Sequence, residues 1–209
     1  MAFLLFDLER CLAFPPVLSK LTDMTQIEEI SSALAASPHG DAFLRPNLTD
    51  FFTPILAAKD VTLVLVSNSE NKAISNVVKK LIELKTGFTG IHVSHTEKRN
   101  WSYIKNLWAQ IHPDRKELKG QQVLFMDDVD NDELRKDPNA AGLCVVHCKP
   151  FEYRITRRHV DAVDAILKKY DQEAYDPKQT GILDIFDEDE DGQSLSLVSS
   201  FLEQTTRFE

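Results

Sequence analysis

Phe3-Leu4-Leu5-Phe6-Asp7-Leu8-Glu9 is the stretch that decides the fold, because an apolar run near the N-terminus stops at two carboxylates. Four apolar residues in a row followed by acid are typical of a buried β-strand. In open parallel α/β sheets, ligands bind at the carboxyl ends of such strands. The stretch therefore predicts a strand that delivers Asp7 and Glu9 to a candidate site.

Two later stretches repeat this pattern. The aliphatic run 61–66 ends at Ser67-Asn68, and the apolar run 122–126 ends at Asp127-Asp128. The carboxyl ends of parallel neighbouring strands meet at one edge of a sheet. We therefore expect the polar groups that end the three strands to lie close together.

Amphipathic helical patterns separate the predicted strands. Apolar residues recur at helical spacing in 27–34, 74–82 and 101–111, and a further strand is predicted at 143–147. Regular alternation of strands and helices favours the α/β class. The sequence thus predicts a Rossmann-like layered fold with a mainly parallel central sheet flanked by helices.

Charge is distributed unevenly along the chain, which helps to set the domain bounds. Residues 1–170 carry 22 acidic and 22 basic side chains, whereas residues 171–209 carry 11 acidic and 2 basic ones. We expect one domain over 1–170 and an acidic tail or linker over 171–209, and a further C-terminal domain outside this chain stays open. Segment 15–44 is a candidate for a small cap or flap over the strand ends; otherwise a cap is absent.

Composition restricts the partners and the compartment. We expect no nucleic-acid partner, because the basic residues of residues 1–170 are balanced by acids. No apolar run reaches the roughly 18 residues that cross a bilayer, and no signal peptide is evident. Three cysteines form no even disulfide framework. These features predict free thiols and a cytoplasmic location, and they leave open export by a route without a classical signal peptide.

The polar strand ends suit one kind of chemistry. A carboxylate pair with a third acid binds a hard divalent cation, and Mg²⁺ suits a site that keeps positions for water and phosphate. One carboxylate can attack phosphorus, while a second acid protonates the leaving group and then activates water. A hydroxyl, backbone amides and a lysine would neutralise the phosphoryl oxygens. The pattern therefore predicts Mg²⁺-dependent phosphoryl transfer.

The order of these stretches resembles the haloacid dehalogenase-like (HAD) superfamily, whose first motif is a strand that ends in Asp-x-Asp-x-Thr. The resemblance covers about residues 3–148 and rests on the order of Phe3–Glu9, Val64–Ser69, a lysine and Val123–Asp128. Leu44–Leu48, which two phenylalanines follow, is similar to the segment ahead of the second motif in HAD protein phosphatases. The chain looks most like their magnesium-dependent, protein-tyrosine-phosphatase-like branch.

The resemblance implies roles for the four acidic residues. Asp7 would be the nucleophile and a Mg²⁺ ligand. Glu9 would be the acid/base and would give its backbone carbonyl to the metal. Asp128 would bind Mg²⁺, with Asp127 in support.

The resemblance also implies a phosphate site. Ser67 and the amide of Asn68 would hold the phosphate, and Lys98 would pair with it. Lys72 and Lys105 lie close enough in the sequence to compete with Lys98 for that role.

Two positions depart from the HAD pattern: Glu9 stands where Asp is usual, and Cys11 stands where Thr is usual. At such a position, a misplacement of about 1 Å can cost on the order of 100-fold in rate. These departures favour an alternative, a non-catalytic module that binds a phosphorylated partner or a metal without turnover.

A second alternative is a cysteine-dependent phosphatase. His147-Cys148 through Arg154 fits the His-Cys-x5-Arg pattern, in which a thiolate attacks phosphate cradled by loop amides and the arginine. Pro150 supplies no N–H to such a cradle, and Glu152 would repel phosphate. The same stretch also fits a buried strand cysteine.

The main prediction is therefore a hydrolase: a Mg²⁺-dependent HAD-like phosphatase that works through an aspartyl-phosphate. A small or absent cap would leave its site open to a phosphorylated protein. Phosphotyrosine is the preferred substrate by resemblance, and a small phosphomonoester is the other substrate class.

Overall fold

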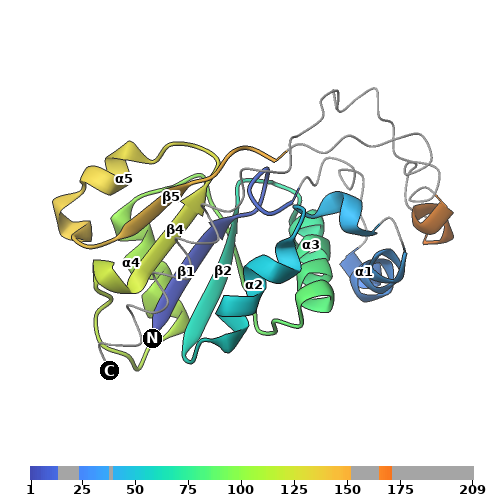
Figure 1. Cartoon of the computed structure of the whole chain (residues 1–209), viewed down its shortest axis with the longest axis horizontal. Helices are drawn as coiled ribbons and strands as arrows, with labels where there is room; N and C mark the ends of the chain where they lie inside the picture. The colour runs from blue at the N-terminus through green and yellow to red at the C-terminus, as the bar shows by residue number, and fades with distance from the viewer. Residues whose placement is uncertain (14–23, 38–39, 152–164, 171–209) are drawn as a thin grey trace.

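The computed structural model describes residues 1–13, 24–37, 40–151 and 165–170 (Figure 1). A five-stranded sheet crosses this part of the chain in the order β3-β2-β1-β4-β5, and all its strand pairs are parallel. The strands are β1 (Ala2–Asp7), β2 (Val61–Ser67), β3 (His92–His95), β4 (Val123–Asp127) and β5 (Cys144–His147). The predicted α/β layered fold with a parallel sheet is confirmed.

Helices cover both faces of the sheet (Figure 1). The α-helices are α1 (Ile27–Ala36), α2 (Leu48–Ala57), α3 (Lys72–Thr86), α4 (Trp101–Ile111) and α5 (Asp132–Lys136). Short 3-10 turns lie at Met24–Gln26, Gly40–Phe43, Gly120–Gln122 and Pro138–Ala140. Buried residues of α2 and α3 pack on one face, where α1 packs against α3, and buried residues of α4 and α5 belong to the core on the other face.

β1 is the centre of both cores because its residues alternate between the two faces. Leu4 and Phe6 belong to the core under α2 and α3, and Phe6 lies 5.4 Å from the Phe51 ring of α2. Phe3 belongs to the opposite core and meets Trp108 of α4 edge-on at 5.3 Å between ring centroids. A strand covered on both faces needs a continuous apolar run, as the sequence of β1 shows. Each large side chain buried in this way contributes roughly 1.5–3 kcal/mol.

The topology brings three strand ends together. β2 and β4 flank β1 on its two sides, and Asp7 is opposite Val66, one residue before the end of β2. The chain continues from β1 through β2 to β3 on one side, and β4 and β5 build the other side. A crevice forms outside the carboxyl ends where the strand order reverses in this way. The polar ends of β1, β2 and β4 therefore share the position at which open α/β sheets bind ligands.

The candidate cap segment 15–44 is described in part. Its helix α1 packs against α3, and the ion pair between Lys80 and Glu28 joins them at 2.9 Å. Residues 14–23 and 38–39 lie outside the described residues, so the cap stays a prediction. The acidic tail 171–209 also lies outside them. None of the described helices has both the length and the apolar character needed to span a membrane.

Candidate active site

Asp7 ends β1 at the floor of a cavity of about 430 Å³. Only 4% of the residue is exposed. Nη2 of Arg99 donates a hydrogen bond to its Oδ1 at 2.6 Å. Burial, assisted by the charge of Asp127, raises the pKa of Asp7 to about 8, and the Arg99 guanidinium opposes this rise. The pKa of Asp7 is thus raised mainly because its carboxyl group is removed from water.

Asp127 and Asp128 complete an acidic cluster with Asp7. Each of the three offers a carboxylate oxygen, and these oxygens lie within 4.8 Å of one another. Asp127 accepts hydrogen bonds from the Val129 amide at 3.0 Å and from Nε of Arg99 at 3.0 Å. Burial raises the pKa of Asp128, although Arg10, 3.7 Å from it, lowers that pKa.

The cluster fits a divalent cation. Hard oxygen ligands at this spacing suit Mg²⁺, which binds through one or two carboxylates and keeps waters and substrate oxygens in its other positions. The cavity as a whole is acidic: five carboxylates and two guanidinium groups line it. Burial is the main cause of the raised pKa of Asp7, and the neighbouring carboxylates add to it. A bound cation would supply positive charge beside these carboxylates. The coarser expectation, an acidic cluster able to hold a metal, is confirmed, and the identity of the metal stays a proposal.

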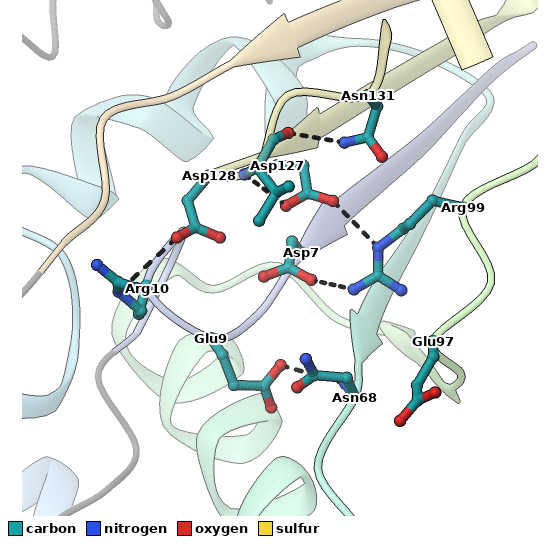
Figure 2. Close-up of a pocket in the computed structure, with 10 residues that line it drawn as sticks. Asp7, Glu9, Arg10, Asn68, Glu97, Arg99, Asp127, Asp128 and Asn131 are labelled. Atoms are coloured by element: carbon teal, nitrogen blue, oxygen red, sulfur yellow. Dashed lines mark hydrogen bonds and ion pairs between the residues drawn. The ribbon is translucent and has the colours of Figure 1, made fainter. Parts of the chain in front are cut away.

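Arg99 is the basic residue that contacts two acids of this cluster. It comes from the loop between β3 and α4, and its guanidinium bridges Asp7 and Asp127 (Figure 2). A third hydrogen bond, from Nη1 to the Thr96 carbonyl at 2.7 Å, fixes the group to its own loop. The planar guanidinium presents several donors at fixed angles, which suits a bridge between two acids.

Lys98, the lysine predicted to pair with phosphate, is exposed and is not among the residues that line the cavity. Lys72 is exposed at the start of α3, and Lys105, which lies on α4, pairs with Glu117 at 3.6 Å. Sequence reasoning therefore missed Arg99, although it lies one position after Lys98. The sequence signal that could have identified Arg99 is the next residue, Asn100. Its side chain caps α4 by accepting a hydrogen bond from the Tyr103 amide at 2.9 Å. This cap fixes where the helix starts and hence which residue before it faces the sheet edge.

Glu9 points away from the acidic cluster. Its carboxylate accepts a hydrogen bond from the Ser67 hydroxyl at 2.5 Å and from the Asn68 amide at 3.4 Å, and Figure 2 shows it directed toward Asn68. Ser67 is fully buried, and its oxygen also accepts from the Ser69 amide and the Ser75 hydroxyl, each at 3.1 Å. Two of the three residues predicted to hold phosphate, Ser67 and Asn68, are therefore brought together, and the Glu9 carboxylate occupies both.

Arg10 forms the second basic wall of the cavity. Its backbone adopts the left-handed conformation, with φ 60°, which turns the chain sharply after Glu9. Its side chain is about half exposed, at 48%, beside Asp128. Neither arginine of the cavity was predicted from the sequence.

Asn131 also lines the cavity, and its side-chain amide donates to the Val129 carbonyl at 2.8 Å. This bond fixes the turn after β4, whose Val129 amide in turn holds Asp127.

Cys148, the nucleophile of the cysteine-dependent phosphatase alternative, is a buried thiol. Cys148 is 3% exposed, and its sulfur lies 3.2 Å from that of Cys11. The amide of Phe151 donates to the Arg10 carbonyl, so it does not point into an anion cradle. Arg154 lies outside the described residues. The burial of this thiol fits the other interpretation of the stretch, in which Cys148 is a cysteine packed in the interior.

Comparisons with known proteins give no further assignment. No protein-family model, no curated protein and no solved structure matches this chain.

Proposed function

We propose that this chain is a Mg²⁺-dependent phosphatase of the HAD type that acts through an aspartyl-phosphate at Asp7. The observation that carries the proposal is the position of Asp7: it ends the central strand at the topological switch point, within 4.8 Å of Asp127 and Asp128 and in contact with Arg99. The order of the strand ends along the chain supports it as well.

In the proposed reaction, an oxygen of Asp7 attacks the phosphorus of a phosphomonoester and the bond from phosphorus to the leaving oxygen breaks. Glu9 gives a proton to that oxygen. Glu9 then takes a proton from water, which attacks the phosphorus, releases inorganic phosphate and regenerates Asp7. A Mg²⁺ bound by Asp7, Asp127 and Asp128 would neutralise charge on the phosphoryl oxygens.

Arg99 takes the part that the resemblance gave to Lys98. It holds one oxygen of Asp7 at 2.6 Å and therefore orients the nucleophile. Its remaining N–H groups lie at the same edge of the sheet as the Asn68 amide and can donate to an equatorial phosphoryl oxygen.

The contacts of Glu9 couple substrate binding to proton transfer. A phosphoryl group that takes the Ser67 hydroxyl and the Asn68 amide must displace the Glu9 carboxylate from both. The displaced side chain is then available for the leaving oxygen. Binding of phosphate thus prepares the acid that the next step needs.

The proposed substrate class rests on the resemblance to the protein-tyrosine-phosphatase-like branch of the HAD superfamily. A phosphorylated protein, with phosphotyrosine as the reacting group, is the proposed substrate, and a small phosphomonoester is the second class. The cavity of about 430 Å³ has room for an aryl phosphate.

A second function is favoured by one observation, the occupation of Ser67 and Asn68 by Glu9. If the carboxylate were never displaced by phosphate, the site would bind a metal or a partner without turnover.

Hydrolysis of p-nitrophenyl phosphate separates these functions. The phosphatase proposal expects turnover with Mg²⁺, loss of turnover with a chelator and loss in Asp7→Asn. Asp130→Asn is a matched control: Asp130 lies three positions after Asp127, is exposed and pairs with Arg135 at 3.1 Å. Activity that survives Asp7→Asn and is lost in Cys148→Ser would contradict the proposal. No turnover of aryl phosphates or phosphopeptides by the wild type would favour the binding module.

A further inference from the structure

Two of the three cysteines lie side by side although 137 positions separate them in the sequence. Cys11 follows β1 and is fully buried, and Cys148 directly follows β5 and is 3% exposed. Their sulfur atoms are 3.2 Å apart. This separation is shorter than the roughly 3.5–4.0 Å of optimal contact between two carbon atoms, although sulfur is the larger atom. The pair is therefore in closer contact than apolar packing requires.

The two backbone segments that carry these thiols are fixed to each other. Arg45 donates from Nη1 to the Cys11 carbonyl at 2.6 Å and from Nη2 to the Lys149 carbonyl at 2.7 Å. The Phe151 amide donates to the Arg10 carbonyl at 2.5 Å. One hydrogen bond thus joins the two segments directly, and the Arg45 guanidinium bridges them with two more, so the fold sets the separation of the sulfurs.

Cys148 is also fixed to the sheet. Its amide donates to the Asp127 carbonyl at 2.9 Å, which continues the pairing of β5 with β4 past the end of the strand. A bond between the sulfurs requires a separation of about 2.05 Å, so the atoms must approach by roughly 1 Å. Side-chain rotation with small backbone shifts can supply that movement.

We propose that Cys11 and Cys148 are a modification site, a dithiol that a hydroperoxide oxidises to a reversible disulfide. The bond would join the segment after β1, which carries Glu9 and Arg10, to the segment after β5. It would leave Cys144 as a thiol, because that residue lies within β5, four positions before Cys148.

The chemistry balances with a hydroperoxide as the oxidant. The sulfur of Cys148, the slightly exposed member, attacks one peroxide oxygen; the O–O bond breaks, a sulfenic acid forms, and the thiol proton leaves in the alcohol or water that is released. The sulfur of Cys11 then attacks the sulfenic sulfur, the S–S bond forms, and the hydroxyl group leaves as water with the Cys11 proton. Two thiols are oxidised and one peroxide is reduced. A small dithiol reverses the step by exchange.

The test uses the full chain, reduced and then treated with hydrogen peroxide. Remaining thiols are blocked with an alkylating agent, and the protein is digested without reductant. We expect the count of reactive thiols in the unfolded protein to fall from three to one, with a mass loss of about 2 Da. We expect one linked peptide pair that contains Cys11 and Cys148, and a dithiol should restore all three thiols.

Cys144→Ser is the matched control and should still form the linked pair. Cys11→Ser and Cys148→Ser should not form it. The wild-type peptide map needs no variant, so the test holds even if a serine at either buried position prevents folding. Three thiols left after treatment, a link through Cys144, or sulfinic acid without a link would each overturn the proposal. These readouts are masses and thiol counts, so they do not depend on whether the chain is a phosphatase.

Discussion

The carboxylate of Glu9 accepts a hydrogen bond from the Ser67 hydroxyl at 2.5 Å, at the place where the proposed reaction needs that hydroxyl for phosphate. Aspartate, with one methylene fewer, has a shorter reach toward Ser67 from the same backbone position. The departure of Glu9 from the HAD pattern therefore has a structural consequence: the side chain competes with the substrate for its own binding groups.

Glu9→Asp should relieve this competition. We expect tighter binding of inorganic phosphate and a kcat/KM higher by about 10- to 100-fold, because the shorter acid leaves Ser67 and Asn68 to the substrate. Calorimetric titration with phosphate and steady-state hydrolysis of p-nitrophenyl phosphate measure the two effects. Glu117→Asp, which makes the same change at a surface glutamate with an 81% exposed side chain, should alter neither. Weaker phosphate binding in Glu9→Asp would mean that the glutamate supports the phosphate site.

Arg99→Ala should lower kcat/KM by about 10²- to 10³-fold, because it removes the donor that orients Asp7 and that can stabilise the phosphoryl oxygens. Lys98→Ala, the adjacent basic residue, should change kcat/KM by less than about threefold, since its side chain is exposed outside the cavity. Kinetics of both variants with Mg²⁺ distinguish the two positions. The reverse ranking would restore Lys98 as the residue that pairs with phosphate.

Metal-free protein should lose stability as the pH rises from about 4 to 8. The folded-state pKa of Asp7, about 8, lies above its unfolded value near 4, so over this range the folded state holds a proton that the unfolded state has released. The contribution is fully present below the unfolded pKa and disappears as the pH passes the folded one; the raised pKa of Asp128 acts in the same direction.

Asp7→Asn should flatten this pH profile by an amount on the order of a few kcal/mol, because the amide does not titrate. Urea unfolding at pH 5 and pH 8 with a chelator present measures the difference. Equal pH profiles for the wild type and Asp7→Asn would show that the pKa of Asp7 is not raised in the folded protein.

Mg²⁺ should stabilise the folded chain. A ligand at 100 times its Kd adds about 2.7 kcal/mol, which for a chain of this length corresponds to a rise in Tm of roughly 5–10 °C. Asp128→Asn should abolish most of the rise because it removes one of the three clustered carboxylates, whereas Asp130→Asn should keep it. Thermal unfolding with and without Mg²⁺ provides the measurement, and an equal rise in both variants would place the cation elsewhere.

The fold could be predicted because its signals are local. β1, β2 and β4 are continuous apolar runs, and only a sheet covered on both faces buries all of them. Parallel pairing of β1 with β4 then places Asp7 and Asp127 at the same edge of the sheet. The acid at the end of each apolar run already predicted this position.

The side-chain contacts of the site could not be predicted in the same way, because the spacing of residues along the sequence does not determine which side chains meet. Lys98 and Arg99 are adjacent basic residues, and the start of α4, fixed by the Asn100 cap, decides which of them reaches Asp7. The contact of Cys11 with Cys148 needs the order of strands in the sheet, which a pattern along the chain does not give.

Trapping of the phosphorylated enzyme tests the central claim most directly. Wild-type protein is mixed with excess p-nitrophenyl phosphate and Mg²⁺, quenched in acid during turnover and digested, and its peptides are weighed. A gain of about 80 Da on the peptide that contains Asp7, absent from Asp7→Asn, is the predicted result. Turnover with phosphate on Cys148, or with no phosphate on the Asp7 peptide under conditions that preserve acyl phosphates, would contradict the account.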